Sequence, residues 1–150
     1  MKTYPLLLAM LLTGFWASAQ DLSLYEKKEF TQKGNTMPYR LLMPKNYQPE
    51  KEYPLILVLH GAGERGNDNE AQLTHGAKLF LDEEYREKNP AFVLFPQCPT
   101  DDFWSNVAVK TQSDGSRTFD FQNGGNPTPA MVSLQALLND FIKNHPVDKD

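Results

Sequence analysis

The stretch "LVLHGAGERGNDN" (57–69) decides how the fold of this chain is interpreted. An apolar run ends at His60, and Gly61, Gly63 and Gly66 follow it in the spacing G-x-G-x-x-G. Directly after a strand, that spacing is the fingerprint of a dinucleotide-binding fold. A tight glycine turn after a buried strand also suits a loop whose backbone amides stabilise an oxyanion during ester or amide hydrolysis. The surrounding sequence separates the two interpretations.

Two apolar segments beside this stretch predict a parallel sheet. The runs "YPLILVLH" (53–60) and "AFVLFPQC" (91–98) are almost continuously apolar, which is typical of strands that helices cover on both faces. Between them, "GAKLFLDEEYREKN" (76–89) predicts a helix. We expect the inner face of that helix to carry Leu79, Phe80 and Tyr85.

The segments before and after complete an α/β pattern. "LYEKKEF" (24–30) and "MPYRLLM" (37–43) flank a turn-rich tetrapeptide and predict a β-hairpin. Near the other end, Thr128, followed by Pro129, can cap a helix over about 130–143. Its apolar residues recur at three- and four-residue spacing on one face: Met131, Leu134, Leu138, Phe141 and Ile142. The predicted fold class is therefore α/β, a β-hairpin followed by a parallel strand–helix–strand–helix unit.

The dinucleotide interpretation conflicts with this pattern. A dinucleotide fold opens a helix at the second glycine so that its amides meet a pyrophosphate, but the turn formers of 66–69 delay any helix here. It also places an acid about 20 residues further on, at the end of the second strand. The second strand here ends in "FPQC" (95–98), and the first acid after it is Asp101. We therefore favour the oxyanion interpretation, which needs no cofactor.

Backbone amides are the candidate functional groups of the loop. Hydrolysis of an ester or amide passes through a tetrahedral oxyanion, which needs N–H donors that are fixed before the reaction begins. Small residues after a strand let the chain turn sharply and aim such amides. We expect Ala62 to donate one N–H and Gly63 the second. A plain tight turn is the alternative for the glycines alone.

The first nineteen residues have the features of a secretory signal peptide. Lys2 provides a positive start, 6–12 is almost wholly apolar, and "ASA" (17–19) is an A-x-A cleavage site. The apolar core is shorter than the roughly 20 residues that span a bilayer, so no stable membrane anchor is expected after cleavage. The sequence thus predicts a signal over 1–19 and one domain over 20–150, in a secreted or periplasmic protein.

Composition excludes other function classes. The formal net charge is −4 over 150 residues, so the chain lacks the basic excess of a nucleic-acid-binding protein. Cys98 is the only cysteine, and no disulfide can form within the chain. In an exported protein, a lone cysteine is either buried and inert or separated from its partner. The sequence leaves that choice open.

Several further segments match one family in order and spacing. They are "MPYRLLMPKNY" (37–47), "LTHGAKLF" (73–80), "FVLFPQCP" (92–99), Trp104 and "NPTPAMVSLQALLNDFIKNHPVDKD" (126–150). With the glycine stretch, they make residues 24–150 resemble the N-terminal half of secreted α/β-hydrolases of the phospholipase/carboxylesterase and predicted-peptidase type. The polyhydroxybutyrate depolymerase, feruloyl esterase and prolyl oligopeptidase-like branches are similar to this type.

The resemblance implies a fold, an activity and a site. The expected fold is the N-terminal part of an α/β-hydrolase, with an incomplete sheet. The expected activity is that of a serine hydrolase of carboxylic esters, which acts on a small-molecule or polymer-linked ester without a metal or other cofactor. By the same resemblance, the loop after His60 supplies part of the oxyanion hole, at Ala62 with Gly63 beside it.

The expected nucleophile is absent from the sequence. Such hydrolases carry it in Gly-x-Ser-x-Gly, followed in order by an acid and a histidine. None of the serines after the signal has those flanking glycines: Ser23, Ser105, Ser113, Ser116 and Ser133. We therefore expect a portion truncated before the nucleophile elbow and inactive alone, whose strand near 55–60 lacks one neighbour in the sheet.

Other side chains near the loop have plainer expected roles. His60 is expected to shape the loop, and His75 to support it or to lie in a turn. A zinc site formed by these two histidines and Asp68 matches no usual ligand spacing. Glu64 and Arg65 are expected to pair with each other or to brace the loop against a neighbouring segment.

Two alternatives to an esterase stay open. One is a peptidase of the same fold, and the other is a non-catalytic binding protein that uses the same loop. Trp104 is the candidate substrate contact, and its alternative role is to fill the space beneath a long loop. Fold analogy alone does not choose among these activities.

Overall fold

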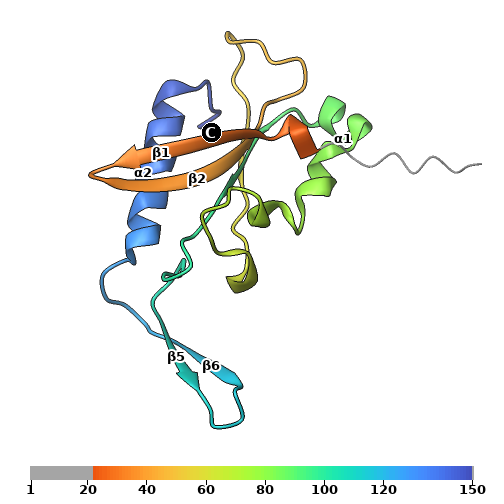
Figure 1. The fold of residues 1–150 in the computed structure, drawn as a ribbon. Coiled ribbons are helices and arrows are strands. Elements are labelled where there is room, and N and C mark those ends of the chain that lie inside the picture. The colour runs from red at the N-terminus through yellow and green to blue at the C-terminus, as the bar shows by residue number, and fades with distance from the viewer. Residues whose placement is uncertain (1–21, 150) are drawn as a thin grey trace, which may run out of the picture.

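The computed structural model describes residues 22–149. Their main element is a four-stranded sheet in the order β1-β2-β4-β3 (Figure 1). The strands are β1 (Glu26–Gln32), β2 (Asn35–Leu42), β3 (Leu55–Leu57) and β4 (Phe92–Pro96). The β1–β2 and β2–β4 pairs are antiparallel, whereas β3 and β4 run parallel. The mixed sheet and its helices confirm the predicted α/β class.

The N-terminal β-hairpin forms as predicted, with a tighter turn. The register of β1 and β2 ends at the pair Gln32–Asn35, which leaves only Lys33 and Gly34 between the strands. Both of these residues have a positive φ, 50° and 84° respectively. A type I′ turn requires such values at both positions, because its twist then matches that of the two strands.

The two predicted apolar strands form a parallel pair, but β3 is shorter than expected. Every residue of β4 is buried, and alternate residues of β4 reach the cores on the two faces of the sheet. β3, in contrast, covers only Leu55–Leu57 and is half-buried. The predicted strand over 53–60 is therefore wrong in length, since β3 has one full neighbour among residues 22–149.

The other edge of β3 is occupied only at its start. Tyr53 N–H donates to Pro146 O and Asp148 N–H donates to Tyr53 O, both at 2.9 Å. Pro54 O points the opposite way and accepts the Phe92 N–H of β4 at 2.9 Å. Residues 146–148 therefore pair with Tyr53, just before β3, on the side that faces away from β4.

The prediction of a single helix over 76–89 is wrong. The structure has a 3-10 helix, η4 (Ala77–Leu81), followed by the short helix α1 (Glu83–Lys88). Asp82 separates them with an extended backbone (φ −63°, ψ 123°), and its Oδ1 accepts the Tyr85 N–H at 2.8 Å. Asp82 thus caps a new helix rather than continuing the preceding one.

The predicted inner face of this segment is wrong for Leu79 and Tyr85, and only Phe80 of the three residues packs against the core. η4 ends at Leu81 and α1 begins as a separate helix after Asp82, so no single inner face runs through the segment. Ala77 and Leu81 are buried, whereas Leu79 is 64% exposed. Phe80 is half-buried against the Phe95 ring at 6.0 Å, and Tyr85 is exposed.

The helix α2 (Pro129–Asn144) covers one face of the sheet (Figure 1). Thr128 caps it as predicted, because Thr128 Oγ1 accepts the Met131 N–H at 3.1 Å. The fully buried residues of α2 are Ala130, Leu134, Leu137 and Phe141. Leu137 was not among the predicted face residues, while Met131, Leu138 and Ile142 pack at the border of the core, partly buried.

The opposite face of the sheet packs against short helices. These are η3 (Ala71–Leu73) and η4, and η1 (Leu22–Leu24) lies beside η4. The core on this side consists of Tyr25, Leu42, Leu73, Ala77, Leu81, Val93 and Phe95. Tyr25 Oη donates to Ala77 O at 2.8 Å, which fastens the start of the described chain to η4.

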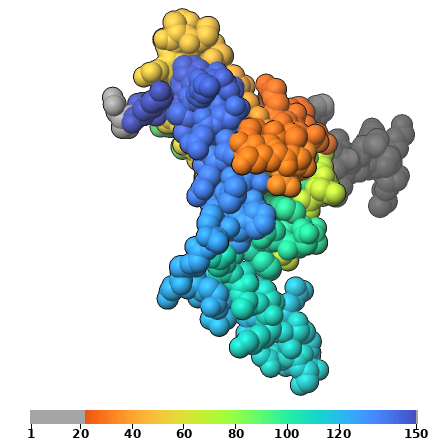
Figure 2. All heavy atoms as spheres, turned by 90° about the vertical axis from the view of Figure 1, so that its left-hand side faces the viewer, coloured from red at the N-terminus to blue at the C-terminus, as the bar shows by residue number. Residues whose placement is uncertain are grey.

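A hairpin that no pattern above predicted projects from the rest of the molecule (Figures 1 and 2). It consists of β5 (Val107–Thr111) and β6 (Arg117–Phe121), which pair antiparallel. Phe119 and Phe121 remain exposed on it, Phe121 to 69%. The missed signal was the dipeptide Asp114-Gly115 between two alternating segments, a strong hairpin indication. Gly115 has a φ of 82° in that turn.

The predicted signal peptide over 1–19 lies outside the described residues. Among residues 22–149, no helix combines the length and the apolar character needed to cross a bilayer. Export of the protein therefore stays a prediction from the sequence.

Candidate functional site

The glycine loop over 60–69 lies where the parallel strands β3 and β4 end. It begins with a short 3-10 helix, η2, which runs from Ala62 to Glu64. The Glu64 N–H donates to Gly61 O at 3.4 Å, so the amides of Ala62 and Gly63 precede the first hydrogen bond of the turn. Within residues 22–149, neither of these amides has a hydrogen-bond partner, and both residues are exposed. The loop thus offers two adjacent N–H donors.

The spacing G-x-G-x-x-G reflects packing within this loop. A Cβ at Gly61 would lie 3.1 Å from Glu64 Oε2, and one at Gly66 would lie 3.1 Å from Gln97 Nε2. A Cβ at Gly63 would meet nothing within 4 Å. Close approach accounts for the first and third glycines. The helix that a dinucleotide site needs here is replaced by η2, which ends at Glu64.

His60 holds the start of the loop. Its Nε2 accepts the Cys98 N–H at 2.9 Å, so the ring proton is on Nδ1, which faces Gly61 O at 2.7 Å. Both ring nitrogens are therefore engaged with the backbone. The Trp104 indole N–H donates to His60 O at 3.2 Å, and the two rings meet edge to face at 5.4 Å. His60 shapes the loop, and Trp104 lies half-buried beside it.

Gln97 is fully buried after β4 and binds the loop from within. Its Oε1 accepts the Asn69 N–H at 2.8 Å. Its Nε2 donates to Asp68 Oδ1 at 2.7 Å and to Glu64 O at 3.2 Å. No motif pointed to Gln97, but one signal was available: a glutamine that ends a buried apolar strand needs hydrogen-bond partners.

Cys98 contributes through its backbone. Its O accepts the Gly66 N–H at 2.9 Å, in addition to the bond from its own N–H to His60. The side chain is fully buried and forms no disulfide within the described residues. Burial raises the pKa of the thiol to about 12, so at neutral pH the group is not the thiolate that a nucleophile requires.

The carboxylate of Asp68 closes the loop. Its Oδ1 accepts the N–H groups of Glu70 and Ala71 at 2.9 and 3.1 Å, besides the bond from Gln97. These bonds, first among them the one from the Glu70 amide, lower the pKa of Asp68 to about 2. Across residues 22–149, no three His, Cys, Asp or Glu side chains gather as a metal-ligand set would.

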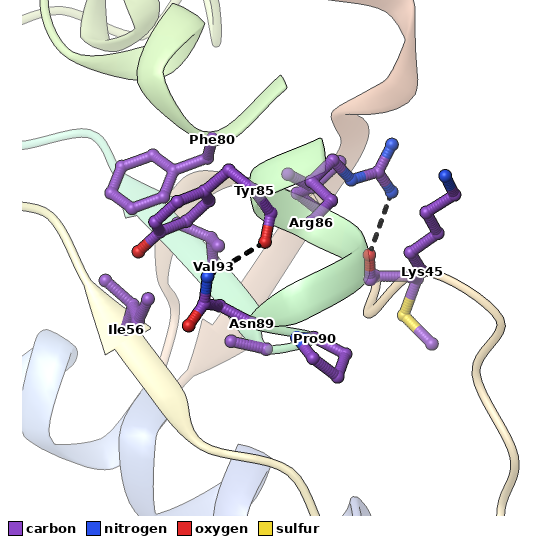
Figure 3. A pocket seen from close by; sticks show the side chains of 11 residues that line it. Lys45, Ile56, Phe80, Tyr85, Arg86, Asn89, Pro90 and Val93 are labelled. Atoms are coloured by element: carbon purple, nitrogen blue, oxygen red, sulfur yellow. Dashed lines mark hydrogen bonds between the residues drawn. The ribbon is translucent and has the colours of Figure 1, made fainter. Parts of the chain in front are cut away.

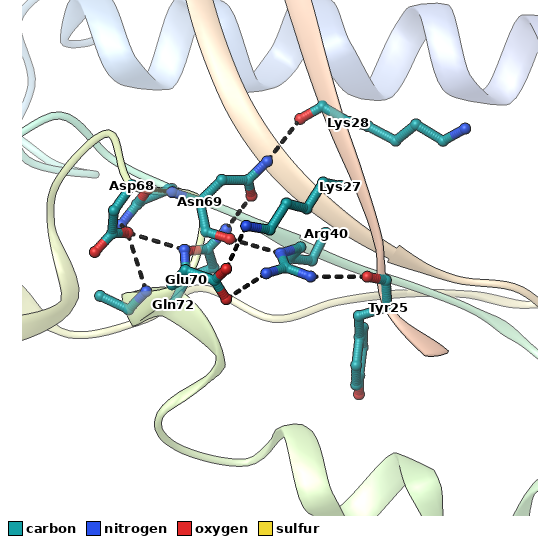
Figure 4. Close-up of polar contacts among 10 residues, drawn as sticks. Tyr25, Lys27, Lys28, Arg40, Asp68, Asn69, Glu70 and Gln72 are labelled. Carbon is teal, nitrogen blue, oxygen red and sulfur yellow. Dashed lines mark hydrogen bonds and ion pairs between the residues drawn. The ribbon is translucent and has the colours of Figure 1, made fainter. Parts of the chain in front are cut away.

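A buried arginine anchors the far end of the loop to the sheet (Figure 4). Arg40 on β2 is 5% exposed. Its Nε donates to Asn69 O at 2.6 Å, its Nη1 donates to Tyr25 O at 2.8 Å, and its Nη2 pairs with Glu70. The Asn69 side chain donates to Lys28 O at 3.0 Å. The loop is therefore tied to β1, β2 and the end of β4.

Arg65 links the loop to the segment after β4. Its Nε donates to Ala62 O at 2.9 Å and its Nη1 to Asp102 O at 3.0 Å. The guanidinium also lies 4.1 Å from the centre of the Phe103 ring, a cation–π contact. Arg65 was expected either to pair with Glu64 or to brace the loop against a neighbouring segment. The structure shows the second role.

Glu64 turns toward His75 rather than toward Arg65. Its Oε1 lies 3.4 Å from His75 Nε2, on a largely exposed imidazole. The alternative of a Glu64–Arg65 pair is therefore wrong. His75 does contact the loop, as expected.

One hollow borders the site, and two others lie elsewhere on the described residues. An open hollow of about 340 Å³ borders the loop at Gly66, Asn67, Gln97 and Pro99, a size within the range of ligand pockets. Ser133 lines a separate open hollow of about 520 Å³ that contains no histidine. A third, between α1 and the start of β4, measures only about 10 Å³ (Figure 3), which suits a single water.

The chain is similar to a solved structure, the crystal structure of a thermostable esterase. The similarity has a TM-score of 0.67 with 32% sequence identity, and it covers 84% of this chain. It covers 32% of the esterase chain, so the present chain spans about a third of that protein's length. No family model and no curated protein matches the sequence. The described residues thus have a partial α/β-hydrolase-like fold.

Proposed function

We propose that this chain forms the N-terminal part of an exported serine hydrolase of carboxylic esters. In this proposal, the loop over 60–66 supplies part of the oxyanion hole through the amides of Ala62 and Gly63. The substrate is a small-molecule or polymer-linked ester. The nucleophilic serine, the acid and the histidine come from sequence that follows Asp150.

The observation that carries the proposal is the pair of unpartnered amides at the start of η2. An oxyanion hole needs backbone donors that are in place before charge develops on the substrate oxygen. His60, Gln97 and Arg65 hold the surrounding backbone with hydrogen bonds. The similarity of 84% of this chain to part of an esterase supports the same activity.

The proposed reaction is acyl transfer to a serine. The serine hydroxyl attacks the ester carbonyl carbon while the histidine takes its proton. The carbonyl oxygen becomes an oxyanion, which the N–H groups of Ala62 and Gly63 stabilise. The intermediate then expels the alcohol, which takes the proton from the histidine, and water hydrolyses the acyl-enzyme in a second cycle. Trp104, beside the loop, is proposed to border the substrate.

Cys98 and Ser133 are poor candidates for the nucleophile. The thiol of Cys98 is buried, and its pKa of about 12 keeps it protonated. Ser133 lies in α2, and no histidine lines the hollow beside it. A serine needs an adjacent base to become nucleophilic, which supports a nucleophile from elsewhere in the protein.

The test compares this chain with the product of the complete reading frame. We expect the complete product to hydrolyse p-nitrophenyl acetate and to be labelled on a single serine by a serine-directed phosphonate. The 150-residue chain should show no turnover above background. Turnover by the chain alone that the phosphonate abolishes would contradict the assignment of the nucleophile.

The remaining outcomes separate the alternatives. A stop codon directly after Asp150, or a complete product that is neither labelled nor active, would favour a non-catalytic binding protein. Faster cleavage of peptide p-nitroanilides than of p-nitrophenyl esters would favour a peptidase.

A further inference from the structure

We propose that Gln97 is a positioning residue for the oxyanion loop. Its side-chain amide fixes the backbone at Glu64, and it thereby sets the direction of the Ala62 and Gly63 N–H groups. The inference rests on the proposed function, because it names the residue that prepares that same site.

The Gln97 amide directs two donors and one acceptor at a single loop. The acceptor takes the Asn69 N–H at 2.8 Å, and the donors reach Asp68 Oδ1 at 2.7 Å and Glu64 O at 3.2 Å. A carboxylate has no donor, and an apolar side chain has neither donor nor acceptor. Because Gln97 is fully buried, its own amide nitrogen and oxygen depend on these protein partners.

These bonds bracket the two free amides. Glu64 directly follows Gly63, and the Glu64 N–H closes η2 onto Gly61. A shift of the peptide that Gln97 binds at Glu64 therefore passes into the adjacent turn. On the other side, His60 is fixed by the N–H of Cys98, the residue after Gln97. The turn is held at both ends by two consecutive residues.

Gly66 makes this contact possible. A Cβ at Gly66 would lie 3.1 Å from Gln97 Nε2 and 3.8 Å from Gln97 Cδ. An alanine at this position requires the Gln97 amide or the loop to move by a few tenths of an ångström. The contact with Gln97 thus explains the glycine at position 66. A substitution of Gly66 is therefore a second way to disturb the same contact.

Gln97 also has a purely structural bond, from which the positioning role must be distinguished. Its backbone N–H donates to Pro38 O at 2.8 Å, which continues the β2–β4 pairing. Side-chain substitutions keep that bond. A merely structural role for the side chain would change stability without changing the environment of the Ala62 and Gly63 amides.

The first test follows the amide NMR signals of Ala62 and Gly63 in the full chain. We expect Gln97→Met and Gln97→Glu to shift both signals at pH 7, whereas Gln135→Met, on the exposed surface of α2, should leave them unchanged. Unmoved signals in folded Gln97→Met would overturn the proposal. If that variant does not fold, Gly66→Ala tests the same contact from the loop side, with the same two outcomes.

A pH titration of Gln97→Glu adds a signature that a structural role would not give. At neutral pH, the new buried carboxylate faces the carboxylate of Asp68 and cannot donate to it. In the variant Asp68 keeps the backbone N–H bonds from Glu70 and Ala71, which contribute most to lowering its pKa, so the new carboxyl group takes up a proton first on acidification and restores one donor. We expect the two amide signals to return toward the wild-type positions between pH 7 and pH 4, with no such return for Gln97→Met. Equal behaviour of the two variants would contradict the role of the donor.

The second test uses the complete, active product. Because a misplacement of about 1 Å can cost about 100-fold in rate, we expect Gln97→Met to lower kcat by about that factor with KM changed less than about threefold. An unchanged kcat in folded Gln97→Met would overturn the positioning role alone. An inactive wild-type product would contradict the proposed function, and with it the catalytic meaning of any amide shift.

Discussion

Arg40 lies on β2 with almost no exposed surface, yet its guanidinium reaches three separate parts of the chain. It binds the backbone of Tyr25 and of Asn69, and it pairs with Glu70. Asn69 has a φ of 55°, a conformation that asparagine tolerates better than most residues. Residues far apart in sequence thus contact one buried cation, and these contacts hold the loop against β2.

Arg40→Met should destabilise the fold markedly. The substitution keeps much of the side-chain volume but leaves the carbonyl oxygens of Tyr25 and Asn69 without their donor. Leaving such groups unsatisfied costs about 1–3 kcal/mol each, so we expect a loss of about 2–6 kcal/mol in the free energy of unfolding, measured in urea. Lys27→Met is the matched control, because Lys27 pairs with the same Glu70 from an exposed position. That control should cost less than about 1 kcal/mol, and equal effects of the two variants would contradict a special role for Arg40.

Asp68 should make the loop sensitive to acid. Its pKa in the folded chain is about 2, below the usual 3.8. A carboxyl with a lowered pKa adds stability above its unfolded pKa, and that contribution is lost as pH falls through the folded value. The difference in unfolding free energy between the wild type and Asp68→Asn should therefore shrink as pH falls from about 4 to about 2. A difference that stays constant over this range would show that the Asp68 carboxylate is not held as described.

The glycine and apolar patterns could be read from sequence, but the buried polar partners could not. Gly61 and the apolar run before it are local features, so they indicated the turn and the presence of a strand, although the strand is shorter than predicted. Arg40 and Gln97 form hydrogen bonds with Asn69, from which they are 29 and 28 positions away in sequence. The spacing of apolar residues does not predict contacts over such a separation. The contacts of candidate site residues such as Trp104 depend in the same way on tertiary packing.

The positions of N-cap residues explain which predicted helices agree with the structure. α2 was predicted within one residue at each end, because Thr128 and Pro129 begin it and its apolar spacing continues to its last turn. The segment over 76–89 was predicted as one helix because its apolar spacing gave no sign of a break. Aspartate is more favourable at a helix N-cap than in a helix interior, and Asp82 divides the segment into two helices.

Thr128 should be measurably important for α2. Its Oγ1 accepts the Met131 N–H and donates to Phe103 O at 2.7 Å. Loss of such a cap costs about 0.5–2 kcal/mol, so Thr128→Ala should lower the free energy of unfolding by about 1–2 kcal/mol in a denaturant titration. Thr128→Ser keeps the hydroxyl and should retain most of the stability. If serine and alanine were equally destabilising, the methyl group rather than the cap would be responsible.

At the scale of the whole molecule, the described sheet is asymmetric. β1 and β2 are paired along their length, whereas β3 is paired fully only with β4. Residues 146–148 begin to follow the opposite edge of β3 at Tyr53. This arrangement agrees with a fold that matches about a third of an esterase chain.

Hydrogen exchange should reveal that asymmetry within β3. Peptide groups alternate in direction along a strand, so Ile56 and Val58 donate toward β4, as the Val58 N–H bond to Leu94 O at 2.9 Å shows. The amides of Leu55 and Leu57 face the other edge and should exchange faster in this chain by at least about tenfold, since unpaired edge amides open at little cost. In the complete product, their exchange should slow to the rate of their neighbours. Equal protection of all four amides in this chain alone would show that the edge is already covered.

The Ala62 N–H is proposed to stabilise an oxyanion, and Ala62→Pro in the complete product removes that single donor. Ala62 is the first residue of η2, where proline is well tolerated, and the preceding Gly61 is already extended (φ −79°, ψ −178°), as a residue before proline should be. The substitution therefore removes the donor with little change in the shape of the loop. An unchanged thermal unfolding midpoint would show that the protein still folds. Ser133→Ala serves as a control that should retain activity. We predict that Ala62→Pro lowers kcat for p-nitrophenyl acetate by about 10²–10³-fold; an unchanged kcat in a folded Ala62→Pro protein would contradict the account.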